Sequence, residues 1–121
     1  MIDIAKCVQS NMDFYRYASA KLNDMIINMY AQAIEAKDSG EGNNASTIAS
    51  TACILEGLRD VVEREFSDCM CQYGKGMKLY DAVIDNLNDK SKIIQDRDFI
   101  LSYELAKSTL HNIAKEGGFI E

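Results

Sequence analysis

The residues of this 121-residue chain best suited to chemistry are two pairs of carboxylates, each with a spacing of three. Glu35 pairs with Asp38, and Asp60 pairs with Glu63. Side chains three residues apart lie on one face of a helix, and carboxylates on two facing helices suit Mg²⁺. A Mg²⁺-dependent hydrolase would need all four carboxylates to meet in one cavity.

This pattern is similar to the two acidic helix motifs of the all-α nucleotide pyrophosphohydrolases. The resemblance implies Mg²⁺-dependent hydrolysis of nucleotides, with the four carboxylates as metal ligands. Those enzymes carry Glu-x-x-Glu followed by Glu-x-x-Asp, whereas this chain has Glu-x-x-Asp followed by Asp-x-x-Glu. Because a chain with 19 acidic residues produces such pairs by chance, the enzyme is our alternative, and a solvated acidic face is the main interpretation.

The single histidine and the C-x-C pair give no complete site. His111 has Lys107 and Lys115 four residues to either side, so no carboxylate on its own helix orients it for catalysis. Cys69 and Cys71 point to different sides of a helix and lack the further ligands of a zinc site. We predict a surface or boundary histidine and reduced cysteines that pack as small apolar residues.

The sequence Gly74-Lys75-Gly76 lacks the remaining glycine and the Ser or Thr of a phosphate-binding loop. Two glycines inside a helix cost together about 2 kcal/mol relative to alanine. We therefore expect a helix that bends here or stops and restarts. No catalytic residue, metal ligand or cofactor is predicted.

The charge of the chain favours some partners over others. A net charge of -6 opposes binding to nucleic-acid phosphates and favours a basic protein partner. Five acidic residues on one predicted helix form a candidate acidic face: Glu56, Asp60, Glu63, Glu65 and Asp68. A continuous stripe with phosphate-like spacing would make the chain a nucleic-acid mimic, which is our second alternative.

The elements that position these residues are long helices, since apolar residues recur at steps of three and four and proline is absent. We predict a helix over Asp3–Lys37, a turn over Asp38–Asn44, and a helix over Ser46–Asp89. A turn over Asn86–Ser91 precedes a last helix over Ile93–Glu116, which Ser91 or Asp96 caps and Gly117-Gly118 ends. Phe119 and Ile120 follow as a short apolar tail.

The predicted fold is a single all-α domain over residues 1–121, an antiparallel hairpin of two long helices completed by a shorter helix. The bundle has three helices, or four if the glycines break the second one. No segment has the apolar length of a membrane span or the pattern of a signal peptide. We expect a cytoplasmic chain that binds neither membranes nor nucleic acid directly.

A short last helix leaves part of the long hairpin uncovered. A second apolar set on the first helix widens its apolar stripe beyond one seam, namely Phe14, Tyr17, Ile26, Ile27, Tyr30 and Ile34. The candidate interface residues are Tyr17, Met25, Tyr30, Gly74 and Gly76. We expect a homodimer or another protein to bind there. The function that this predicts is a non-enzymatic one, as an adaptor, a chaperone or an inhibitor, and a virus-encoded antagonist of a host complex is one form of it.

Overall fold

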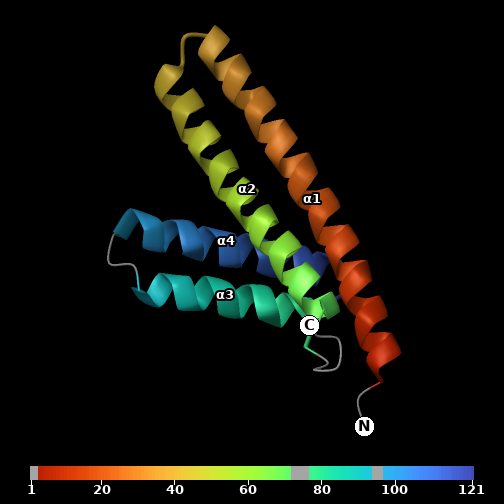
Figure 1. Cartoon of the computed structure of the whole chain (residues 1–121). Coiled ribbons are helices and arrows are strands. Elements are labelled where there is room, and N and C mark those ends of the chain that lie inside the picture. The colour runs from red at the N-terminus through yellow and green to blue at the C-terminus, as the bar shows by residue number, and fades with distance from the viewer. Residues whose placement is uncertain (1–2, 72–76, 94–96) are drawn as a thin grey trace.

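A computed structural model describes residues 3–71, 77–93 and 97–121 of the chain. This part contains four helices and no strand, which confirms the all-α prediction. The helices are α1 (Ile4–Asp38), α2 (Gly42–Cys71), α3 (Leu79–Ile93) and α4 (Arg97–Glu116). The long helices α1 and α2 form an antiparallel hairpin, and α3 and α4 form a shorter hairpin that crosses one end of it (Figure 1).

A glycine ends α1 and starts the turn of the long hairpin. Gly40 has a φ of 83°, and its N–H donates to the Lys37 carbonyl at 3.1 Å. The Glu41 N–H donates to the Ala36 carbonyl at 2.8 Å, which completes a Schellman motif. A turn therefore lies within the predicted segment Asp38–Asn44, but it is shorter than predicted, since only residues 39–41 separate the two helices.

The predicted start of the second helix at Ser46 is wrong, because α2 begins four residues earlier at Gly42. The Ala45 N–H donates to the Glu41 carbonyl at 2.9 Å, so Glu41 already stands at the N-cap. The asparagines that follow, which we expected in the turn, enter the first turn of the helix.

The predicted helix over Ser46–Asp89 is interrupted, since α2 ends at Cys71 and α3 begins at Leu79. Gly74 and Gly76 lie outside the described residues. The described residues therefore form the four-helix alternative of the predicted bundle, in which the second long helix is broken, and not the three-helix one.

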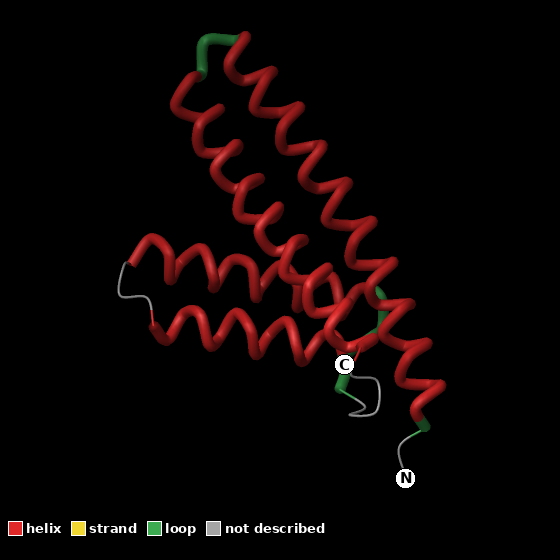
Figure 2. Tube along the Cα trace, viewed as in Figure 1, coloured by secondary structure: helices red, strands yellow, loops and turns green. Residues whose placement is uncertain are grey.

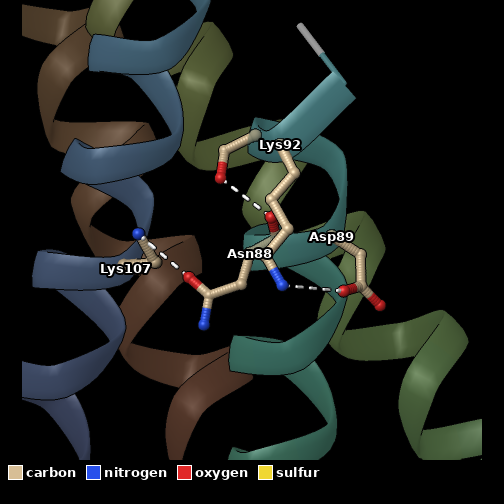
Figure 3. A network of polar contacts seen from close by, with 5 residues as sticks. Asn88, Asp89, Lys92 and Lys107 are labelled. Carbon is tan, nitrogen blue, oxygen red and sulfur yellow. Dashed lines mark hydrogen bonds and ion pairs between the residues drawn. The ribbon is translucent and has the colours of Figure 1, made fainter.

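The predicted turn over Asn86–Ser91 is wrong, because these residues lie inside α3. The side chains of the two asparagines bond to neighbouring helices instead of forming a turn. Asn86 donates to Glu65 on α2 at 2.8 Å. Figure 3 shows the second bond, in which Lys107 on α4 donates to Asn88 at 3.0 Å. Tertiary hydrogen bonds here outweigh the local turn preference.

The last helix begins at Arg97, four residues after the predicted start at Ile93. Ser91, a predicted N-cap of that helix, lies in α3 and donates to the Asn88 carbonyl at 2.9 Å. Asp96, the other predicted cap, lies outside the described residues. The end at Glu116 is as predicted.

The core lies where the two hairpins cross (Figure 2). Its largest fully buried side chains come from all four helices: Leu22, Leu55, Leu58, Leu79, Leu87, Leu110, Val62 and Val83. The chain after α4 also contributes, since the Phe119 ring packs edge-on against Phe14 with ring centres 5.1 Å apart. The apolar tail therefore folds back onto α1.

A buried asparagine ties α1 to the start of α3. Asn11 is 5% exposed; it donates to the Met77 carbonyl at 2.9 Å and accepts from the Leu79 N–H at 2.9 Å. The Leu79 N–H belongs to the first turn of α3, where no carbonyl of the same helix is available. Asn11 on α1 thus provides the hydrogen-bond acceptor for a backbone N–H group at the N-terminal end of α3.

Within the described residues, no helix combines the length and apolar composition that crossing a bilayer requires.

Candidate protein-binding face

The end of the long hairpin that carries the 39–41 turn projects away from α3 and α4 (Figures 1 and 2). Its seam is made mainly of buried alanines, namely Ala33, Ala36, Ala45 and Ala52. Alanine lets two helices approach closely, but each alanine removes little apolar area from water. This end of the hairpin is therefore a two-helix layer without a third element across it.

A groove of about 470 Å³ runs between the two helices at this end. Four residues of α1 (Tyr30, Ala33, Ile34, Lys37) and four of α2 (Gly42, Ala45, Ser46, Ala49) line it. Most of these side chains are apolar or small, so the groove offers a hydrophobic floor that is open to solvent.

Two isoleucines stand exposed beside the groove. Ile34 is 62% exposed and Ile27 is 65% exposed. Ile27, Tyr30 and Ile34 are spaced by three and four residues, so they share one face of α1. We call Ile27, Tyr30 and Ile34 of α1, together with Ala45, Ser46, Ala49 and Cys53 of α2, the open face. An apolar surface of this kind marks an interaction site more often than a scattered exposed residue does.

Tyr30 joins the two helices of the open face. Its hydroxyl lies 3.4 Å from the Cys53 sulfur. Hydrogen bonding with Cys53, followed by hydrogen bonding with Glu56, raises the pKa of Tyr30 well above its ordinary value. The phenol therefore stays neutral, and it marks the point where the apolar groove meets the first carboxylate of α2.

The structure divides the predicted acidic face into two groups. Asp60 and Glu63 are exposed and lie four and seven residues after Glu56, so these three share the side of α2 next to Tyr30. Glu65 turns toward α3, where it accepts a hydrogen bond from Asn86 at 2.8 Å. Asp68 follows Glu65 by three residues and shares its side. The five carboxylates do not form the continuous stripe that a nucleic-acid mimic would need.

Glu56, Asp60 and Glu63, which we call the acidic row, have no ion-pair partner in the described part of the chain. The ion pairs there join Lys92 to Asp89 and Lys107 to Glu104. Arg59, which lies within the acidic row, donates instead to Asn23 on α1 at 2.8 Å. The three carboxylates outnumber Arg59, so this surface keeps a net negative charge that is available to a partner.

The four carboxylates of the predicted Mg²⁺ site do not come together. Arg59, next to Asp60, contacts Asn23, which lies twelve residues before Glu35 on α1. At 1.5 Å per residue, the two pairs are about 18 Å apart along the hairpin. The described residues contain no group of three or more His, Cys, Asp or Glu able to hold a metal ion.

The candidate interface residues have different positions. Tyr30 lies on the open face, as described. Tyr17 is half-buried against Phe119, with ring centres 5.7 Å apart, and Lys21 approaches its ring. Met25 is half-buried against the core. Gly74 and Gly76 lie outside the described residues.

Sequence reasoning did not select Ile27 and Ile34 as interface residues, although both belong to the second apolar set of the first helix. The extra width of that stripe was the available signal. Which part of the stripe stays uncovered depends on where α3 and α4 cross, which local spacing does not specify.

The remaining candidate groups make ordinary structural contacts. His111 is exposed, and its Nδ1 lies 3.3 Å from the Tyr80 hydroxyl. Burial, followed by the charge of Asp81, raises the pKa of Tyr80, so this hydroxyl is no base at neutral pH. All four cysteines are free.

A second groove of about 330 Å³ lies between α2 and the second hairpin and includes Ile54 and Tyr103.

Comparisons of this chain with protein-family models, with curated proteins and with solved structures find no match.

Proposed function

We propose that this chain is a non-enzymatic protein-binding module that acts through its open face. The observation that supports this proposal is the pair of exposed isoleucines beside an apolar groove, on a part of the hairpin that lacks a third layer. Burying an exposed isoleucine side chain is favourable by about 1.5–3 kcal/mol. A helix of another protein that covers the open face would therefore gain free energy from both isoleucines.

An adaptor, a chaperone or an inhibitor would each use such a face, and the net charge of -6 favours a basic partner. A homodimer is a second candidate, supported by the shape of the open face. Ile34 protrudes next to a hollow lined by Ala45 and Ala49. A two-fold axis would place each Ile34 in the hollow of the other copy.

Affinity capture from cell extract with two matched variants tests the proposal. Ile34→Asp puts a charge on the open face, whereas Leu101→Asp puts the same charge on α4, where Leu101 is 56% exposed and lines neither groove described above. We expect wild type and Leu101→Asp to retain the same proteins and Ile34→Asp to lose them. Far-UV circular dichroism checks that both variants remain helical. Equal retention by Ile34→Asp would exclude the open face as the binding surface.

Light scattering of the purified chain tests the homodimer. A dimer doubles the monomer mass of 13.5 kDa, and Ile34→Asp returns the mass to that of the monomer. A wild-type chain that stays at 13.5 kDa over the accessible concentration range would exclude the homodimer.

A further inference from the structure

The geometry points to one kind of occupant for the open face: an amphipathic helix of a partner protein, apolar toward one end and basic toward the other. This inference rests on the proposed protein-binding function and specifies the partner. It is carried by three features of the described residues, namely the shape of the groove, the acidic row beyond it and the net charge of the chain.

The groove favours a helix over an extended peptide. Both of its walls are helices, whose backbone groups already bond within each helix. An extended segment would bring unpaired N–H and C=O groups onto an apolar floor, which is unfavourable. A helix satisfies its own backbone and presents only side chains, and small residues such as Ala45, Ser46 and Ala49 let a large apolar side chain approach closely.

The acidic row continues the line of the groove along α2. Glu56 lies beside Tyr30 at the end of the apolar region, and Asp60 and Glu63 follow on the same side. A helix packed along α2 presents Lys or Arg at matching spacings of four and three residues. The three carboxylates of the acidic row outnumber Arg59 and have no ion-pair partner in the described residues, so basic side chains would meet a net negative charge.

The net charge separates this partner from a second copy of the chain. At -6 each, two copies repel one another at long range, whereas a basic helix is attracted. From Ser46 to Glu63 the surface spans 17 residues of α2, or about 26 Å. The partner helix therefore has about 17 residues, with its apolar anchors over Ile34 and Ala49 and its basic residues over the acidic row.

Designed helical peptides test this inference on the full-length chain. One peptide of about 18 residues carries leucines on one face of one half and three lysines at matched spacing in the other half. A second peptide replaces the lysines with glutamates, and a third replaces the leucines with serines. Fluorescence anisotropy measures the binding of each at about 50 and about 300 mM NaCl.

We expect the leucine–lysine peptide to bind, and the other two peptides to bind at least about tenfold more weakly. We also expect a triple variant of the acidic row to bind the leucine–lysine peptide about tenfold more weakly or worse, and to lose most of the salt dependence of this binding. This variant carries Glu56→Gln, Asp60→Asn and Glu63→Gln. A control triple variant removes the same charge from other surfaces and should keep most of the affinity for this peptide. It carries Asp81→Asn, Asp85→Asn and Glu116→Gln.

Equal loss in the two triple variants, or equal binding of the lysine and glutamate peptides, would overturn the inference. So would an absence of binding by the leucine–lysine peptide at about 100 µM, well above the micromolar affinities of ordinary complexes. A dimer that Ile34→Asp dissociates and that this peptide does not displace would assign the open face to a second copy.

The outcomes distinguish this inference from the proposed function. Captured proteins that are lost with Ile34→Asp but retained by the acidic-row triple variant support a protein-binding module and contradict a basic partner helix. Captured proteins that Ile34→Asp retains contradict the proposed function itself.

Discussion

Asn11 shows how much a single polar residue determines in this fold. It is the buried polar side chain among the described residues. One of its hydrogen bonds goes to Cys7 on α1, and the other two cross to Met77 and Leu79, where the chain enters α3. Met77 and Leu79 are more than 60 residues away in the sequence, so no local pattern identifies them. A sequence shows where an apolar stripe is interrupted, but not which distant backbone groups the interrupting residue satisfies.

The variant Asn11→Ala tests this contact. It removes a donor and an acceptor and leaves the Leu79 N–H without its bond in a position where the Leu79 residue is fully buried. We expect the free energy of unfolding to fall by about 1–3 kcal/mol, measured by urea denaturation. Asn28→Ala, at an exposed position of α1, is the control and should change stability by less than about 0.5 kcal/mol. Similar values for the two variants would contradict the structural role of Asn11.

Cys69 gives a second test at the residue scale. Burial, followed by the charge of Glu65, raises the pKa of the Cys69 thiol above its ordinary value of 9.0. A raised pKa leaves less thiolate at neutral pH, and the thiolate is the reactive form. In a variant with the other three cysteines replaced by serine, we expect the alkylation rate to reach half its maximum at a higher pH when folded than in urea. If the pH at which the alkylation rate reaches half its maximum is the same in the folded and the unfolded chain, Cys69 is neither buried nor close to Glu65 as described.

At the scale of helices, ends set by glycine were predictable and ends set by tertiary contacts were not. Gly40 and Gly118 both have positive φ, and both follow the last turn of a periodic segment. Asn86 and Asn88 have the composition of a turn but lie inside α3, because they bond to α2 and α4. Local propensity describes the chain alone, whereas these side chains find partners on other helices.

Replacing two glycines by alanine, Gly57 inside α2 and Gly117 directly after α4, should change the stability in opposite directions. A Cβ atom at Gly117 would lie 2.7 Å from the Phe119 ring and 2.8 Å from the Tyr17 ring, so both rings must move. We expect Gly117→Ala to lower stability by about 1–3 kcal/mol, since Phe119 packs on the core. Gly57 is inside α2 with no neighbouring heavy atom within 4 Å of the new Cβ, so Gly57→Ala should raise stability by about 0.5–1 kcal/mol.

Thermal unfolding followed by circular dichroism measures both glycine variants. The comparison is matched, because each variant adds the same methyl group to a residue of ordinary backbone conformation. Changes of the same sign in the two midpoints would contradict the close packing of Tyr17 and Phe119 around Gly117.

For the whole molecule, the sequence predicted that apolar surface would remain uncovered, and of the predicted interface residues Tyr30 lies on the open face, whereas Tyr17 and Met25 pack against the core. Tyr17 was expected at an interface with a partner, yet the chain's own Phe119 packs against it. The open face instead lies around Ile27 and Ile34, beyond the crossing point of α3 and α4. Helix spacing gives the width of an apolar stripe, whereas the crossing of two hairpins decides which length of it is covered.

The charge of the whole chain leads to a last prediction, in which salt acts oppositely on the fold and on the proposed complex. Acidic residues outnumber basic ones by 19 to 13, and the Lys92–Asp89 pair is exposed, with its atoms 4.0 Å apart, so it contributes little. Repulsion between acidic residues should therefore dominate surface electrostatics. Salt screens this repulsion, so the unfolding midpoint should rise by a few degrees between about 20 and about 500 mM NaCl.

The acidic-row triple variant provides the control for this measurement. Because it removes three carboxylates that have no ion-pair partner among the described residues, its unfolding midpoint should rise less with salt than that of the wild type. The same increase in salt should weaken binding of a basic helix, since attraction is screened as well as repulsion. A wild-type midpoint that falls with salt would mean that attractive pairs dominate the surface, and the acidic row would then be compensated within the chain and unavailable to a partner.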